Sequence, residues 1–188
     1  MTDISNSTQD NGNSNGVVRP FNFMKWIEDN RHLLKPPVNN KVVYKDTEFI
    51  IMVVGGPNSR KDYHYNESEE FFYQLEGNIN VQIQENGKAV MVPIKQGEIF
   101  LLPPRIPHNP MRGPNTIGLV IERKRREGEK DGLLWFCEKC NHKLYEEYFK
   151  LTDIATQFQV VFEKFYTNKE LRTCKSCGTV MDPPPVIK

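Results

Sequence analysis

Two stretches of sequence decide the fold: residues 62–77 read DYHYNESEEFFYQLEG, and residues 97–112 read GEIFLLPPRIPHNPMR. The first carries an aromatic-rich run that ends at a glycine, and the second carries an apolar run that ends at two prolines. Both patterns are typical of β-strands bounded by turns. Each stretch also contains one histidine, His64 in the first and His108 in the second. The sequence therefore predicts two strands with a histidine close to each.

The residues between these stretches predict a hairpin. Residues 80–84 alternate polar and apolar side chains, which is the period of a strand with one buried face. Asn86 and Gly87 then form a strong two-residue turn signal, because both central positions of such a turn require positive φ. Residues 89–92 return as the partner strand. Since the chain doubles back here, we expect the two histidine-bearing segments to be neighbours in one barrel.

His64, Glu70 and His108 are the candidate ligands of a catalytic metal. Two imidazoles and one carboxylate on one side of a metal leave its opposite side open for substrate and oxygen, as in the facial triad of non-heme Fe(II) oxygenases. Taken singly, each residue has a plainer interpretation. A lone histidine in a β-protein is more often a core or surface residue, and Glu70 with its neighbour Glu69 could be a solvated pair.

The spacing of these residues resembles the cupin superfamily. The first cupin motif ends in Glu, six residues and Gly, which Glu70 and Gly77 match. The second contains Gly, Pro and His, which Gly97, Pro103 and His108 match. The resemblance implies an all-β cupin fold, a double-stranded β-helix or jelly-roll barrel. An N-terminal helix and a small C-terminal segment with two CxxC motifs complete the expected architecture.

The chain departs from the cupin pattern at three places. The usual His-x-His pair survives only as residues 64–66, His-Tyr-Asn, which favours a two-His, one-Glu site over the commoner three-His, one-Glu site. Arg105 stands where the second motif usually has glycine, and Arg112 stands where it often ends in asparagine. The last departure places a guanidinium just beyond a predicted metal ligand.

Longer strings are similar to the 3-hydroxyanthranilate 3,4-dioxygenase family, in its shorter microbial form with one cupin. These strings are residues 53–64, 69–75, 99–104 and 108–112, and the resemblance extends from residue 21 to residue 184. It implies Fe(II)-dependent ring opening of 3-hydroxyanthranilate by O2 to 2-amino-3-carboxymuconate semialdehyde, which leads to quinolinate and NAD. It also implies a homodimer.

The same resemblance assigns roles to further residues. Arg112 matches the residue that grips the substrate carboxylate. Glu122 matches one that orients the polar groups of the substrate, and Glu70 is expected to contact the substrate as well. Arg60 matches a residue near the oxygen position. Without the resemblance, arginines before strands are usually solvated, and Glu122 could simply pair with Arg123.

The only four cysteines of the chain form two CxxC motifs, Cys137 with Cys140 and Cys174 with Cys177. Two such knuckles are a strong signal for tetrahedral thiolate coordination, and Gly178 suits the tight turn after the second knuckle. The alternative is two disulfides, which reducing compartments disfavour. The closed donor set predicts a structural or redox-active metal, Fe or Zn, and the family resemblance favours a rubredoxin-like iron.

Composition limits the class of protein. The 188 residues carry a net charge of +1, which gives no general attraction to nucleic acid or anionic membranes. No apolar run approaches membrane-spanning length, and a signal peptide is not apparent, so we expect a cytoplasmic protein. Residues 1–16 are polar and predicted to be disordered. We divide the remainder into a cupin barrel with its N-terminal helix (17–130) and a C-terminal cysteine segment (131–188).

The flanking segments give weaker signals. Asn22 is a plausible N-cap of a helix that residues 36–37, both proline, would stop. Residues 41–54 predict two strands, residues 117–121 a buried strand, and residues 163–166 part of a helix.

Two other function classes agree with parts of the sequence. A non-catalytic cupin would bind a small acid without oxygen uptake. A zinc ribbon would combine the cysteine knuckles with the basic run at residues 123–126 to bind nucleic acid in a salt-sensitive way. Acidic residues follow that run, so we expect it to be a solvated connecting loop, and the near-neutral charge disfavours nucleic acid.

Overall fold

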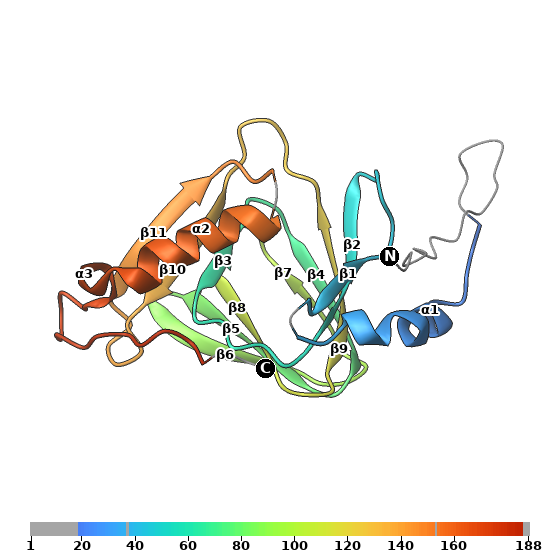
Figure 1. The fold of residues 1–188 in the computed structure, drawn as a ribbon, viewed down its shortest axis with the longest axis horizontal. Helices are drawn as coiled ribbons and strands as arrows, with labels where there is room; N and C mark the ends of the chain where they lie inside the picture. Colours follow the sequence, from blue (N-terminus) through green and yellow to red (C-terminus); the bar gives the residue numbers. More distant parts are fainter. Residues whose placement is uncertain (1–18, 37, 153, 186–188) are drawn as a thin grey trace, which may run out of the picture.

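The computed structural model describes residues 19–36, 38–152 and 154–185, and two β-sheets form its body (Figure 1). The first sheet has the strand order β1-β2-β9-β4-β7. These strands are β1 Asn40–Val42, β2 Phe49–Gly55, β9 Ile117–Arg123, β4 Glu70–Glu76 and β7 Ile99–Leu102. The second sheet has the order β11-β10-β3-β8-β5-β6. These strands are β11 Lys143–Phe149, β10 Asp131–Phe136, β3 Tyr63–Tyr65, β8 His108–Arg112, β5 Ile79–Glu85 and β6 Lys88–Ile94.

The strand pairings confirm the all-β barrel and the hairpin predicted from the sequence. β5 and β6 pair antiparallel through the turn at Asn86 and Gly87, whose φ angles of 50° and 74° are both positive. β3 pairs with β8 in the register that sets His64 opposite His108. The two histidine-bearing segments are therefore neighbours, as expected.

The barrel interior is filled from both sheets. Alternate residues of β4 and β5 point inward, because successive side chains of a strand face opposite sides of the sheet. Their apolar members pack with residues of the remaining strands. The buried cluster consists of Phe72, Ile79, Val81, Ile83, Ile94, Leu102 and Val120. Buried polar residues occupy the same interior, and among them His108 contacts Phe72 of this cluster.

The N-terminal helix α1 (Phe23–Asn30) packs at one end of the first sheet (Figure 1). Asn22 is its N-cap, as predicted, and the side chain accepts a hydrogen bond from the backbone N–H of Lys25. The α-helix ends at Asn30 and continues as the short 3-10 helix η1 (Arg31–Leu33), so it ends before the proline pair that was expected to stop it.

The C-terminal segment extends the second sheet and then crosses it. β10 pairs with β3 on one side and β11 on the other, and α2 (Ile154–Thr167) lies across these strands (Figure 1), followed by α3 (Lys169–Arg172). Trp135 of β10 stacks on Phe165 of α2 with ring centres 4.3 Å apart. The helix predicted around residues 163–166 is confirmed. The division at residue 130 stays a prediction, although β10 is hydrogen-bonded into the barrel sheet.

Residues 1–16, for which disorder was predicted, lie outside the described residues. Among the described helices, none combines the length and the apolar character needed to cross a bilayer.

Candidate functional site

His64, Glu70 and His108 converge inside the barrel from its two sheets. His64 and His108 are cross-strand partners in one sheet, and Glu70 begins β4 in the other. One potential ligand atom from each residue lies within 4.8 Å of the other two, and all three side chains are buried. Two imidazoles and one carboxylate fit a divalent metal of the facial-triad type. The structure thus brings together the residues predicted from sequence, and their role as ligands stays a prediction.

The two imidazoles have different electrostatic surroundings. Burial lowers the pKa of His64 below its ordinary value, although Asp131 lies 2.7 Å from its Nε2 and opposes this shift. Burial also acts on His108, but the negative charge and hydrogen bond of Glu70, 3.1 Å from His108 Nε2, raise the pKa of His108. The interior therefore attracts positive charge next to Glu70, as a cation site requires.

A second carboxylate lies beside Glu70. The register of β4 and β9 places Glu122 opposite Glu70, and the Asn66 amide donates to both, at 3.1 Å to Glu122 and 3.3 Å to Glu70. Burial would raise the pKa of Glu70, but the charge of His108 and its hydrogen bond lower it to about 2. Burial and then the charge of Glu70 raise the pKa of Glu122 to about 7. The contacts of the two carboxyls thus shift their pKa values in opposite directions, downward for Glu70 and upward for Glu122.

Arg112 ends β8 with a buried guanidinium. Burial lowers its pKa to about 10, against the opposing charge of Glu70. Its Nη1 donates to Gln74 Oε1 over 3.3 Å. Gly118 of β9 makes room for this group, since a Cβ there would lie 2.9 Å from Arg112 Nη1 and 2.8 Å from Gln74 Oε1. Sequence reasoning placed Arg112 near the site but missed the role of Gly118 in accommodating it.

Arg60 lies between the barrel and α2. Its Nε donates to Asp62 over 3.0 Å, and the guanidinium carbon lies 5.6 Å from the Phe158 ring centre and 5.7 Å from that of Phe162. Burial lowers the pKa of Arg60, but Asp62 above all, with a contribution from Glu70, raises it beyond its ordinary value. The cation is therefore held by a carboxylate and two aromatic faces, within electrostatic reach of the triad.

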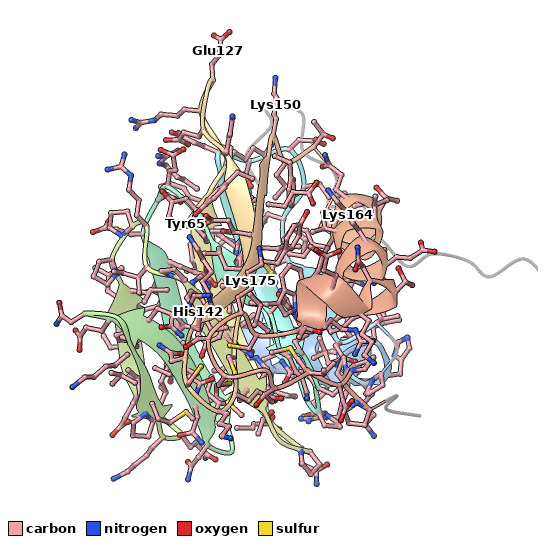
Figure 2. The ribbon with its side chains drawn as sticks, turned by 90° about the vertical axis from the view of Figure 1, so that its left-hand side faces the viewer. Tyr65, Glu127, His142, Lys150, Lys164 and Lys175 are labelled. Atoms are coloured by element: carbon pink, nitrogen blue, oxygen red, sulfur yellow. The ribbon has the colours of Figure 1, made fainter. Side chains whose placement is uncertain are left out.

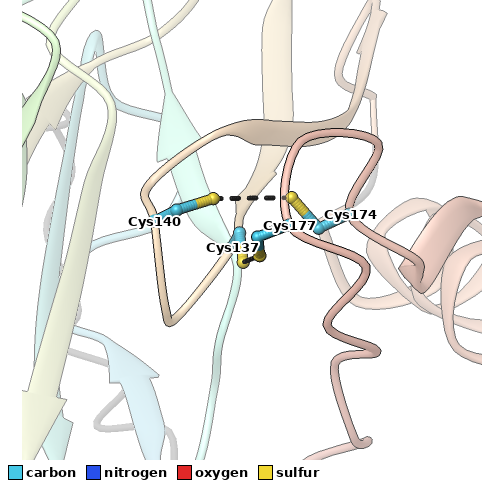
Figure 3. A group of neighbouring side chains, drawn as sticks. All are labelled: Cys137, Cys140, Cys174 and Cys177. Atoms are coloured by element: carbon cyan, nitrogen blue, oxygen red, sulfur yellow. Dashed lines mark hydrogen bonds between the residues drawn. The ribbon is translucent and has the colours of Figure 1, made fainter.

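The four cysteines form one cluster at the far end of β10 (Figure 3). The sulfurs of Cys137 and Cys177 are 3.6 Å apart, and those of Cys140 and Cys174 are 3.5 Å apart. These separations exceed a disulfide bond of about 2.05 Å, and the cysteines are free. They are close to the spacing of about 3.8 Å expected for sulfurs placed tetrahedrally at about 2.3 Å from one ion. The donor set therefore fits a four-thiolate metal.

The two knuckles have the same local geometry. In the first, Asn141 N–H donates to Cys137 O over 2.8 Å, and in the second, Gly178 N–H donates to Cys174 O over 2.9 Å. Both donors have positive φ, 58° for Asn141 and 72° for Gly178. The tight turn predicted at Gly178 thus has a counterpart at Asn141, where sequence reasoning did not look for it.

The basic run at residues 123–126 differs from its predicted role as a solvated loop. Arg123, the last residue of β9, pairs with Glu129. The Arg125 side chain is only 9% exposed. Arg125 Nη1 lies 2.9 Å from Glu122, and Arg125 also pairs with Asp131. The prediction that this whole run is solvated is wrong for Arg125, because its guanidinium turns toward buried carboxylates. The same contact replaces the suggested pairing of Glu122 with Arg123.

Comparison with known proteins identifies the family. The profile of the 3-hydroxyanthranilic acid dioxygenase family matches residues 16–166. The 3-hydroxyanthranilate 3,4-dioxygenase of Xanthomonas euvesicatoria pv. vesicatoria is 54% identical over 168 residues, 89% of this chain and 95% of that protein. The enzyme of the same name from Bacillus cereus is 50% identical over 166 residues, 88% of this chain and 93% of that protein.

Among solved structures, a cupin-2 domain protein from Shewanella frigidimarina has a TM-score of 0.44 and 16% identity, covering 52% of this chain and 92% of that one. The profile match and the two relatives each span most of the sequence, including both histidine-bearing stretches and the buried residues around them. The chain therefore belongs to the 3-hydroxyanthranilic acid dioxygenase family.

Proposed function

We propose that this protein opens the aromatic ring of 3-hydroxyanthranilate with O2, giving 2-amino-3-carboxymuconate semialdehyde. Both atoms of O2 enter the product. The ring bond that breaks joins the hydroxyl-bearing carbon to its neighbour on the side away from the amine. The product cyclises with loss of water to quinolinate, a precursor of NAD. The observation that carries the proposal is the buried set His64, Glu70 and His108 in a member of this family.

Fe(II) is the metal that we propose for this set. Two neutral nitrogen donors and one carboxylate oxygen suit Fe(II) oxygenases, which need three protein ligands and three open positions. Bound Fe(II) would supply the open coordination positions and the electron-transfer chemistry needed to activate O2. Glu70 supports this assignment because its buried carboxylate lies 3.1 Å from Nε2 of His108, which brings an oxygen donor next to a nitrogen donor.

Arg112 is proposed to bind the substrate carboxylate. A guanidinium can donate two parallel hydrogen bonds to a carboxylate, and burial strengthens them by excluding water. In the described part of the chain, its side chain donates one hydrogen bond, to Gln74, which fixes the orientation of the group. Glu70 already places one negative charge in this interior. The positive charge of Arg112 would offset the repulsion that a second carboxylate, that of the substrate, meets there.

Glu122 is proposed to orient the amine and hydroxyl of the substrate together with Glu70. Its pKa of about 7 lets it accept a hydrogen bond or hold a proton at that position. Arg60 is proposed to stabilise negative charge that develops near the oxygen position. Support for Arg60 comes from its fixed placement by Asp62 and its electrostatic interaction with Glu70.

The cysteine cluster is proposed to hold a second metal, rubredoxin-like Fe or Zn, with a structural role. Four thiolates close a tetrahedral site, so no position remains for substrate. The metal would tie the end of β10 to the segment after α3. The segment after α3 also holds Cys177 in place, because its Sγ donates a hydrogen bond to Thr179 Oγ1 over 3.3 Å.

We further propose a cytoplasmic homodimer that pairs through the outer face of the first sheet. Three large apolar side chains on two strands of this sheet are well exposed on its outer face: Phe49, Ile99 and Leu101. Phe71 and Ile121 lie on the same face between them. An apolar patch of this kind marks an interaction surface. Leu101→Lys should shift the mass measured by light scattering from dimer to monomer, whereas Val160→Lys on the exposed side of α2 should not.

The decisive experiment is anaerobic loading with Fe(II), followed by measurement of oxygen uptake with 3-hydroxyanthranilate. We expect one O2 to be consumed per substrate molecule. Formation of the ring-opened product is monitored by its absorbance. Loading with Zn(II) in place of Fe(II) is the control, because Zn(II) has no redox chemistry. Absence of oxygen uptake by the Fe(II)-loaded protein would exclude this function and leave the alternative of a non-catalytic small-acid binder.

A further inference from the structure

Asp131 is the first residue of β10 and is fully buried. Its Oδ2 lies 2.7 Å from Nε2 of His64. Arg125 donates to the same carboxylate with two nitrogens, Nε to Oδ1 over 2.7 Å and Nη2 to Oδ2 over 2.5 Å. A bidentate guanidinium fixes both the position and the plane of a carboxylate. Asp131 is therefore held rigidly against one predicted metal ligand.

Arg125 also connects this carboxylate to the substrate side of the site. Its Nη1 lies 2.9 Å from Oε2 of Glu122, so one guanidinium lies between two buried acids. The connection from β9 to β10 makes this possible, since it carries Glu127 outward at its tip (Figure 2) while the side chain of Arg125 turns inward. Loss of Arg125 would leave both carboxylates without their shared cation.

The hydrogen bonds of the two histidines imply opposite tautomers. A neutral imidazole carries one N–H, and its other nitrogen has the lone pair that binds metal. His108 donates from Nδ1 to the carbonyl of Ile106 over 3.0 Å. In the neutral ring the lone pair is therefore on Nε2, the nitrogen that lies 3.1 Å from Glu70. His64 donates from Nε2 to Asp131, which leaves the lone pair on Nδ1.

We propose that Asp131, fixed by Arg125, is a positioning residue that sets the tautomer and ring orientation of His64, so that His64 binds metal through Nδ1 while His108 binds through Nε2. This rests on the proposed ligand set and extends it to residues with no role so far. Carboxylates that accept the second N–H of a metal-binding histidine orient the ring and raise its basicity. Arg125 would link that orientation to Glu122, the residue proposed to contact substrate.

Histidine nitrogen NMR on the Zn(II)-loaded protein tests the tautomers without any change in sequence. The chain has four histidines, so the His64→Gln and His108→Gln variants suffice to assign both signals. We expect His64 to show a protonated Nε2 and a metal-shifted Nδ1, with the reverse for His108. Metal shift at Nε2 of His64 would overturn this inference alone. Absence of metal shifts at both residues would instead overturn the proposed ligand set.

Asp131→Asn tests the contribution to metal binding. The variant keeps the side-chain shape but loses the anion, and changes of this kind weaken metal affinity about 10- to 100-fold. The readout is the dissociation constant for Co(II), with the thiolate absorption of Co(II) in the cysteine cluster as an internal reference for folding. The matched control is Glu129→Gln, which breaks the Arg123 pair in the same connection. Equal Co(II) affinity in the two variants would show that Asp131 does not position His64.

Discussion

Glu70 and Glu122 lie directly opposite each other on the paired strands β4 and β9, and both are buried. Like charges in such cross-strand pairs normally destabilise a sheet. Here Asn66 donates to both carboxylates, His108 contacts Glu70, and Arg125 pairs with Glu122. These contacts divide the pair into an anion that can bind a cation and a second carboxyl that can exchange a proton.

The first prediction concerns that second carboxyl. Glu122→Gln keeps the size of the side chain but cannot accept a hydrogen bond as an anion. A hydrogen bond to a charged group contributes roughly 1.5–3 kcal/mol, so kcat/KM for 3-hydroxyanthranilate should fall by about 10- to 150-fold. Fe(II) affinity should be retained, because Glu122 is not a proposed ligand. A variant with wild-type kcat/KM would contradict the substrate-orienting role.

Local patterns predicted most strands of the barrel but not β10 and β11, and the resemblance to the cupin motifs indicated the triad. The alternation in β5 and the Asn86-Gly87 turn depend on neighbouring residues, and the structure shows both. His64 and His108 were predicted to meet because a hairpin joins their segments, and they are cross-strand partners. These features have local causes, so a single sequence predicts them.

The surrounding contacts depend on the path of the chain and were not predictable in this way. Arg125 lies in a run of four basic residues, a pattern typical of solvated loops, and only the course of the β9–β10 connection turns it inward. Asp131 belongs to no motif, yet it begins the strand that pairs with β3 beside His64. Gly118 gives no sign in the sequence that its missing side chain accommodates Arg112.

The second prediction concerns the triad. Replacing His64, Glu70 or His108 by alanine should abolish ring opening and remove one equivalent of bound Fe(II), because two remaining ligands cannot hold the ion. His142→Ala, which changes a histidine beside the cysteine cluster, should keep full activity. Iron content by plasma emission spectrometry and oxygen uptake are the measurements. Near-normal turnover in any of the three triad variants would mean that the ligand set is wrong.

The third prediction separates the two metal sites. Cys137→Ser should lower the melting temperature and the content of the second metal, because thiolate–metal bonds tie together two distant segments. Ser176→Ala changes a residue inside the second knuckle without removing a thiolate and serves as the control. Triad iron should still bind in the folded variant. Unchanged melting with complete loss of turnover would contradict a structural role for the cluster.

The fourth prediction tests the packing of α2 on the sheet. Phe165 is fully buried and stacks on Trp135, so Phe165→Ala should reduce the free energy of unfolding by about 3–5 kcal/mol. Val160 on the same helix is 67% exposed, and Val160→Ala should change stability by less than about 0.5 kcal/mol. Urea unfolding gives both values. Similar losses in the two variants would show that α2 is not anchored through Phe165.

The fifth prediction concerns recognition of the substrate carboxylate. Arg112→Ala removes one partner of a buried charge pair, which usually costs about 2–5 kcal/mol. This corresponds to a loss of about 30- to several-thousand-fold in kcat/KM. Arg112→Lys should recover only part of the loss, because an ammonium cannot make the planar two-point contact of a guanidinium.

A substrate without the carboxylate provides the control for Arg112. For 2-aminophenol the deleted interaction is absent from the start, so the loss caused by Arg112→Ala should shrink sharply. The measurement is kcat/KM for both substrates with the wild type and with Arg112→Ala. The coupling free energy between arginine and carboxylate is the difference between the losses that the mutation causes with the two substrates. Equal losses for the two substrates would show that Arg112 does not grip the carboxylate. Arg60, whose charge also interacts with Glu70, would then be the next residue to change.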